Sequence, residues 1–227
     1  MPSDKVTPQY PLSRAEEKAN ALTHGVSALF LLLSLPTALG YLLRQPDLDL
    51  WPAGLSVLVF ILCLVLMFTA SAVYHILPAD HSSKRFWNQL DHMAIFLAIA
   101  GSYTPIALTV IGGTAGWLLF AAEWLLVLAG ILFKAVGFRR NRLTWIISIL
   151  MYLGMGWGIV LCMPLFLRAA RPANVGLIIA GGLFYTSGLI FFAQRWRYSH
   201  LVWHFFVMGG AFCHYVAIVF FLGRPTQ

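Results

Sequence analysis

Charged residues are scarce in this chain of 227 residues: only 10% are Asp, Glu, Lys or Arg, whereas 60% are apolar and the mean hydropathy is +0.80. A soluble domain carries about 25% charged residues, so this chain has too little polar surface to coat a globule in water. The apolar residues fall in long blocks, which are typical of chains that cross a bilayer. The sequence therefore predicts an integral membrane protein. Its net charge of +7 is then explained by basic loops, not by nucleic-acid binding.

Cysteine is scarce as well. Cys63, Cys162 and Cys213 lie in separate apolar blocks, and no two of them have CxxC spacing. This excludes a disulfide framework and a thiolate metal site, so we interpret the three as small hydrophobic residues within the membrane. No lysine lies beyond Lys134, which excludes a retinal protein because such a protein needs a lysine in its last span.

Seven blocks are long enough to cross a membrane, since a spanning helix needs about 20 mostly apolar residues. We therefore expect an all-α membrane protein, a seven-transmembrane-helix bundle over residues 22–222, preceded by a segment at 1–21 and followed by a short tail at 223–227. The predicted spans are residues 22–43, 52–76, 88–111, 115–134, 143–166, 174–194 and 200–222.

Lysine and arginine predict the direction of the spans, because basic residues are retained on the cytoplasmic side. With the N-terminus in the cytoplasm, 11 of the 15 basic residues fall in inside segments. Only Arg44, Arg168, Arg171 and Arg224 fall outside. The pattern thus predicts a cytoplasmic N-terminus and an outside C-terminus, the opposite of a rhodopsin-like receptor.

Ionisable residues inside spans are costly and mark functional sites by default. The second span ends near His75, the third begins near Asp91, and the seventh begins with His200 and His204. The predicted direction places all of them at cytoplasmic helix ends. His200 and His204 are four residues apart, so they project from one helix face, and Ser71 and His75 repeat that spacing.

These residue types predict a zinc site. Three neutral histidines, His75, His200 and His204, complete a three-ligand Zn²⁺ site that leaves a fourth position open for water. Zinc lowers the pKa of such a water to about 7. Asp91 could orient this water or act as its base, and Ser71 could donate a hydrogen bond to a developing oxyanion.

Other polar residues allow more than one interpretation. Glu16, Asn20 and His24 recur every four residues, and they could support the site around its ligands or only tie the amino-terminal segment to the bundle. Glu123 and His214 fall near mid-membrane, where they could pair, line a proton or substrate path, or make structural hydrogen bonds.

Two further patterns concern local structure. Ser13 and Glu16 have the spacing of a capping box, which could start a surface-lying helical turn there. A set of glycines is expected to allow close helix packing: Gly154, Gly156, Gly158, Gly181, Gly182, Gly209 and Gly210.

Together these residues resemble the hemolysin III family, the bacterial branch of the progestin and adipoQ receptor family, which is related to alkaline ceramidases. The matching stretches are E-E-K-A-N-A-L-T-H at 16–24, S-A-V-Y-H at 71–75, L-D-H at 90–92 and S-H-L-V-W-H at 199–204. The resemblance covers essentially the whole chain. It implies a zinc ion on His75, His200 and His204, with Asp91 and Ser71 near its bound water.

The leading hypothesis is a zinc-dependent hydrolase that acts on a membrane lipid at an amide bond, in a bacterial inner membrane with the metal site toward the cytoplasm. The alternative is a non-catalytic regulator of the membrane with a structural zinc ion. A proton or ion transporter that uses Glu123 and His214 is a third hypothesis, although the sequence has no duplicated half of the kind that transporters show.

Overall fold

The computed structural model describes residues 12–45, 49–136 and 142–222, which form helices and no strand. The long helices of the first half are α1 (Arg14–Leu42), α2 (Leu50–Ile76), α3 (Lys84–Pro105) and α4 (Gly113–Val136). The second half contains α5 (Arg142–Gly156), α6 (Met163–Ala169), α7 (Pro172–Phe192) and α8 (Ser199–Phe220). A π-helix, η1 (Ile106–Ile111), continues α3, and a 3₁₀-helix, η2 (Gly158–Cys162), joins α5 to α6.

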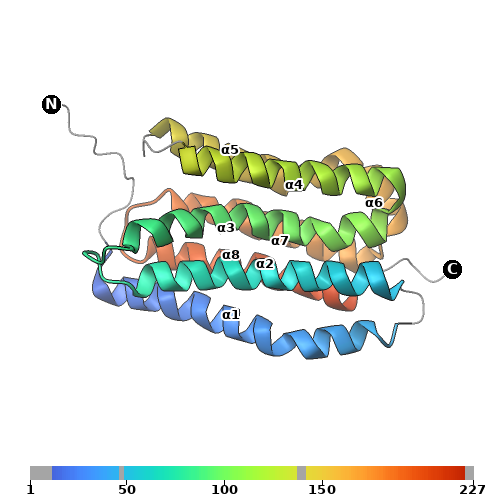
Figure 1. The fold of residues 1–227 in the computed structure, drawn as a ribbon, viewed down its shortest axis with the longest axis horizontal. Helices are drawn as coiled ribbons and strands as arrows, with labels where there is room; N and C mark the ends of the chain where they lie inside the picture. Colours follow the sequence, from blue (N-terminus) through green and yellow to red (C-terminus); the bar gives the residue numbers. More distant parts are fainter. Residues whose placement is uncertain (1–11, 46–48, 137–141, 223–227) are drawn as a thin grey trace.

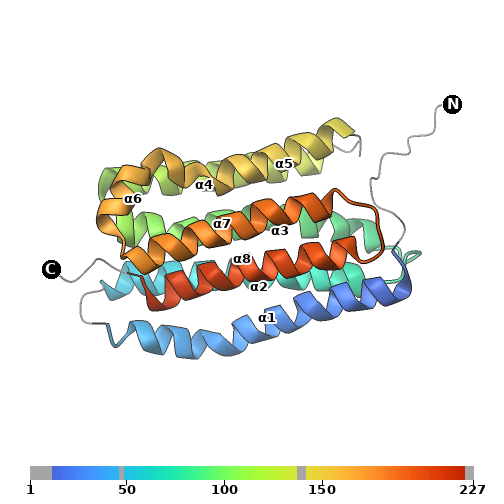
Figure 2. The ribbon, with the colours of Figure 1, turned by 180° about the vertical axis from the view of Figure 1, so that it is seen from behind.

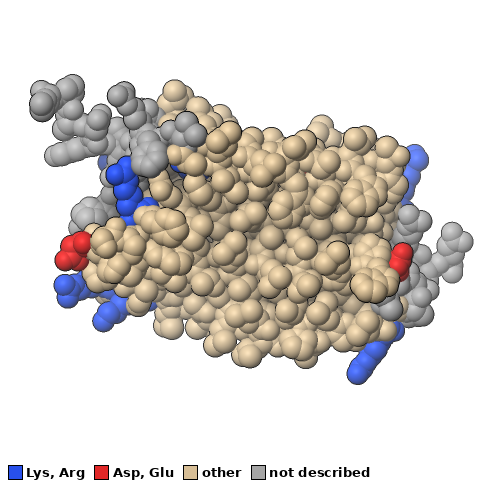
Figure 3. Space-filling view, in the orientation of Figure 1, with Lys and Arg blue, Asp and Glu red and all other residues tan. Residues whose placement is uncertain are grey.

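Within the described residues, seven helical segments are long and apolar enough to cross a membrane, and each overlaps one predicted span. They are Arg14–Leu42, Trp51–Ile76, Lys84–Ile111, Gly113–Ala135, Leu143–Ala169, Pro172–Phe192 and Ser199–Phe220. On the face seen in Figure 3, charged residues gather at the two ends of the molecule and leave a wide uncharged band between them. The prediction of an all-α bundle of seven spanning helices is confirmed. The predicted tail at 223–227 and residues 1–11 of the predicted amino-terminal segment lie outside the described residues.

The first helix begins earlier than the predicted span. Ser13 caps it: its hydroxyl accepts from the backbone N–H of Glu16, and the Glu16 carboxylate accepts from the Ser13 N–H and hydroxyl. This capping box satisfies donors that a helix start leaves unpaired. One side of the turn is buried, since Glu16 is only 2% exposed, whereas Arg14, Ala15 and Lys18 are exposed. Residues 14–21 are part of α1, and Glu16, Asn20 and Ala21 turn its buried side toward the bundle.

The first and last helices of the bundle pack against each other. α1 packs against both α2 and α8, α2 packs against α3, and α7 packs against α8. Figures 1 and 2 show α1, α2 and α8 in the lower part of the molecule, α3 and α7 above them, and α4 to α6 at the top. α1, α3 and α8 begin at the end of the bundle where α2 ends (Figure 1). We call this end the site end.

The fifth span is interrupted near its middle. α5 ends at Gly156, and the chain turns through η2 before α6. The Tyr103 hydroxyl donates to the Gly156 carbonyl (3.0 Å) and accepts from the Ile159 N–H (2.8 Å), so it supplies partners that the broken helix lacks. Such pairing is needed because lipid offers no hydrogen bonds to backbone groups. A methyl group added at Gly154 or Gly156 would meet no atom within 4 Å, so the expectation of close packing at these two glycines is wrong.

Close packing does occur between α7 and α8. A methyl group at Gly188 would lie 2.7 Å from Phe206 Cβ and 2.8 Å from Trp203 Cε3, and both of these residues belong to α8. Phe206 Cβ is fixed to the backbone and cannot move aside. Small residues at such contacts let membrane helices approach, and helix association in lipid depends on this packing.

We therefore expect Gly188→Ala to destabilise the bundle by roughly 1–3 kcal/mol, the usual cost of overpacking. Thermal unfolding of the purified protein in detergent would show this as a lower midpoint. Gly176→Ala is the matched control on α7, because nothing lies within 4 Å of the added carbon. Equal midpoints for the two variants would contradict the proposed contact.

Candidate metal centre

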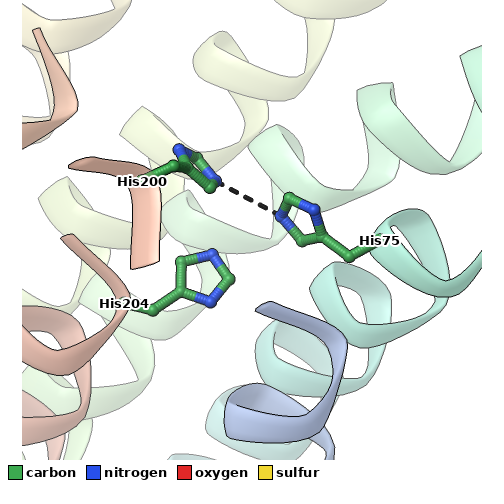
Figure 4. Close-up of side chains that lie close together, drawn as sticks. All are labelled: His75, His200 and His204. Carbon is green, nitrogen blue, oxygen red and sulfur yellow. Dashed lines mark hydrogen bonds between the residues drawn. The ribbon is translucent and has the colours of Figure 1, made fainter. Parts of the chain in front are cut away.

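Three histidine side chains meet at the site end. His75 comes from the last turn of α2, and His200 and His204 come from the first two turns of α8. Their rings point toward one another (Figure 4), and each offers a nitrogen within 4.8 Å of the others. His75 and His204 are each 1% exposed. The structure thus brings together the three residues that were predicted as metal ligands, and this group could hold a metal ion.

Hydrogen bonds at Nδ1 indicate which nitrogen the rings of His75 and His204 present to a metal. The Glu17 carboxylate lies 2.5 Å from His75 Nδ1, and a carboxylate accepts, so Nδ1 carries the hydrogen. The Thr23 hydroxyl donates to the Asn20 carbonyl (2.9 Å) and lies 3.2 Å from His204 Nδ1. Because that hydroxyl has already used its one hydrogen, it accepts from His204 Nδ1–H. Both rings therefore keep the lone pair of Nε2 for a metal.

The spacing of the rings fits a tetrahedral ion. His75 Nε2 and His200 Nε2 lie 3.3 Å apart. Two nitrogens bound to zinc at 2.0–2.1 Å with a tetrahedral angle are separated by about 3.3 Å. Three imidazoles, of which those of His75 and His204 are buried and that of His200 is half-buried, are also a donor set that suits zinc and other first-row metals. The residues present therefore fit a metal with three protein ligands.

His24 supports the site without joining the ligands. Its ring stacks on the His204 ring, with centroids 3.6 Å apart and planes within 5° of parallel. A ligating imidazole holds the metal in its own ring plane, and two stacked rings share no such plane. His24 in this orientation is therefore excluded as a fourth ligand. Phe68 fixes its other side through an edge contact at 4.9 Å.

The other two polar residues predicted on α1 also lie at the site end. The Asn20 side chain is fully buried, and neither of its polar atoms has a hydrogen-bond partner among the described residues. Glu16 Oε1 accepts from the backbone N–H of Tyr198 at 2.7 Å. Tyr198 has a left-handed backbone (φ 64°) and immediately precedes α8. Glu16 thus fastens α1 to the start of the helix that carries His200 and His204.

Ser71 and Asp91 line one cavity together with His24, His200 and His204. Ser71 is buried at 3% exposure, and the Asp91 side chain is 18% exposed, with its Oδ2 3.9 Å from His92 Nδ1. The cavity has a volume of about 170 Å³ and continues between the helices past residues such as Met67, Val207 and Ile178. Polar groups gather at its site end, and apolar side chains line much of the remainder.

The two mid-membrane residues have separate surroundings. Glu123 is 3% exposed, and its Oε1 lies over Gly158 at the interruption of the fifth span. His214 Nε2 lies 3.2 Å from the Ile178 carbonyl, and its ring meets Tyr185 edge-on. Their neighbours thus come from different helices, an arrangement that gives no support to a Glu123–His214 pair.

Three residues near the histidines were not predicted as site residues. Glu17 could not be distinguished from Glu16, because helical spacing alone does not tell which of two adjacent carboxylates faces a particular neighbour. Thr23 carries no charge, so a search for ionisable groups passes over it. The sequence indicates a role for Lys84 only in the direction of the spans, yet in the structure its Nζ lies 3.2 Å from Glu17 Oε1. For Glu17 and Thr23 the sequence did contain an indication, namely the adjacent glutamates and the Thr-His pair within residues 16–24.

Comparison with known proteins shows the family of this chain. A sequence model described as Haemolysin-III related matches residues 12–215. The chain belongs to the hemolysin III family. This confirms the resemblance inferred from the sequence motifs, and the match contains all three histidines.

Among hemolysin III relatives, the chain is 34% identical to Hemolysin-3 of Bacillus cereus over 212 residues, which cover 93% of each chain. It is 31% identical to the Hemolysin-3 homolog of Bacillus subtilis over 207 residues, or 91% of this chain and 94% of the relative. It is also 28% identical to the human Monocyte to macrophage differentiation factor over 222 residues, or 93% of this chain and 87% of the relative. The similarity therefore extends over nearly the whole bundle.

Proposed function

We propose that this hemolysin III protein is a zinc-dependent hydrolase of a membrane lipid, acting at an amide bond. The observation that carries the proposal is the three-histidine group, two members of which, His200 and His204, line a cavity that is also lined by the Asp91 carboxylate and the Ser71 hydroxyl. When bound, zinc would supply an acidified water and a Lewis acid for a carbonyl oxygen.

The protein's own groups have distinct tasks in this proposal. The Asp91 carboxylate orients a water molecule and accepts its proton, as a general base does. The Ser71 hydroxyl donates a hydrogen bond to the carbonyl oxygen as negative charge develops on it. The apolar part of the cavity, with Met67, Val207 and Ile178 in its wall, binds the acyl chain and keeps bulk water away.

The number of ligands favours catalysis over a purely structural metal. A structural zinc site normally has four protein ligands, whereas a catalytic site has three and an open position. Within the described residues, the metal-ligand group contains three histidines, and the stacked ring of His24 cannot supply the fourth ligand in its observed orientation. A non-catalytic regulator remains the second candidate, and it would require another group to complete the coordination.

The proposed location is a bacterial inner membrane, with the site end toward the cytoplasm. The bias of lysine and arginine supports this direction, and the two Bacillus relatives described above, at 34% and 31% identity, are bacterial. The site would then face lipids of the inner leaflet.

A hydrolysis screen tests the proposal. Purified protein in lipid nanodiscs is incubated with N-acylated lipids or with ester lipids of the same chain length, and released fatty acid is measured by mass spectrometry. We expect release from an amide substrate, loss of release after chelation, and recovery when zinc is added back. Protein with a fully loaded metal site that releases no fatty acid from any substrate would favour the regulator instead.

A further inference from the structure

Two adjacent carboxylates in the first turn of α1 hold different helices. Glu16 accepts from the Tyr198 N–H at the start of α8, as described above. Glu17 points toward α2 and α3: its Oε2 lies 2.5 Å from His75 Nδ1, and its Oε1 lies 3.2 Å from Lys84 Nζ. One carboxylate thus uses both oxygens, one on a predicted metal ligand and one on a cation.

Lys84 fixes this carboxylate at the end of α2. Besides Glu17, its Nζ donates to the carbonyl of Tyr74 (2.6 Å) and to that of Leu77 (2.8 Å), and it lies 4.4 Å from the centre of the Tyr74 ring. The Lys84 side chain is 14% exposed and that of Glu17 is 23% exposed, so water screens the pair only in part. The ammonium group therefore holds the Glu17 carboxylate and the last turn of α2 in one arrangement.

We propose that Glu17, held by Lys84, is a positioning residue of the metal site. It fixes His75 in the tautomer with hydrogen on Nδ1 and directs the Nε2 lone pair toward His200. An outer carboxylate on a ligating histidine sets ring orientation and raises ligand basicity, and its loss commonly weakens metal binding roughly 10- to 100-fold. This inference rests on the metal binding assumed in the proposed function.

The test compares a substitution at Glu17 with one at an exposed carboxylate. Glu17→Gln preserves size but removes the charge, and its amide can face His75 with either oxygen or nitrogen, so the tautomer is no longer fixed. We expect the zinc dissociation constant, measured by competition with a chelator, to rise roughly 10- to 100-fold. Asp80→Asn is the matched control, because it removes the charge of an exposed carboxylate in the connection between α2 and α3, and we expect its affinity to stay close to that of the wild type. Glu17→Asp retains a carboxylate and should recover part of the loss.

A second measurement separates positioning from mere stabilisation. Nitrogen NMR of the metal-free, histidine-labelled protein should show His75 with hydrogen on Nδ1 in the wild type and a mixture of tautomers in Glu17→Gln. Unchanged zinc affinity in Glu17→Gln, even with a lower unfolding temperature, would overturn the proposal, and so would an unchanged His75 tautomer. Because the NMR experiment needs neither metal nor substrate, it tests Glu17 even if the wild type fails to bind zinc or hydrolyse lipid.

Discussion

Replacing His200 and His204 together with alanine is expected to reduce the metal content of the purified protein from about one ion per chain to nearly none. These two residues supply two of the three nitrogens in the group, and His75 alone leaves a divalent ion with a single protein ligand. Elemental mass spectrometry of protein purified without chelator measures the ratio directly and also identifies the metal.

The control for this experiment lies on the same helix. His214→Ala removes a histidine from α8 whose Nε2 faces the Ile178 carbonyl and not the histidine group, so we expect the metal to remain. A double variant that keeps a full complement of metal would show that the ion binds elsewhere in the chain.

Replacing Asp91 with asparagine is expected to reduce lipid-amide turnover roughly 10²- to 10⁴-fold, the range for loss of a general base, while the metal remains bound. Asparagine has nearly the same shape as aspartate but cannot accept the proton of an attacking water. Asp91 lies outside the group of three nitrogens, and therefore its loss should leave the ligands intact. Turnover and metal content are measured on the same preparation.

Asp80→Asn serves as the matched substitution, because Asp80 is an exposed carboxylate in the connection between α2 and α3. It should leave both quantities unchanged. Full turnover by Asp91→Asn would assign the proton transfer to another group.

Much of this fold is predictable because the bilayer imposes a strong constraint on sequence. A spanning helix has to satisfy its backbone internally and be apolar over about 20 residues, so each span is visible as an apolar block. The α8 histidines were found because four residues is nearly one helical turn. His75 could be added because the expected direction of the spans put it at the same depth.

The features that the sequence does not predict depend on how a helix is rotated about its axis and on where a helix is interrupted. Neither can be read from the positions of the apolar blocks. Whether Glu16 or Glu17 faces His75 depends on the rotation of α1 about its axis. The mixture of polar and apolar residues in that turn does not determine this rotation. The interruption after Gly156 depends on the Tyr103 hydroxyl, which lies more than 50 residues earlier in the chain. Glycine at that position is equally consistent with close packing and with a helix end.

The meeting of α1, α2 and α8 has a consequence for how the protein is made. His75 and His200 are 125 residues apart, so at the usual 5–20 residues per second roughly 6 to 25 s of synthesis separate them. During that interval His75 and Glu17 are already in the nascent chain, but α8 is not. A ribosome that stops before α8 yields a protein with one of the three nitrogens. The three-histidine group is thus among the last parts of the molecule to be assembled, and an ion bound by all three histidines would distinguish finished chains from unfinished ones.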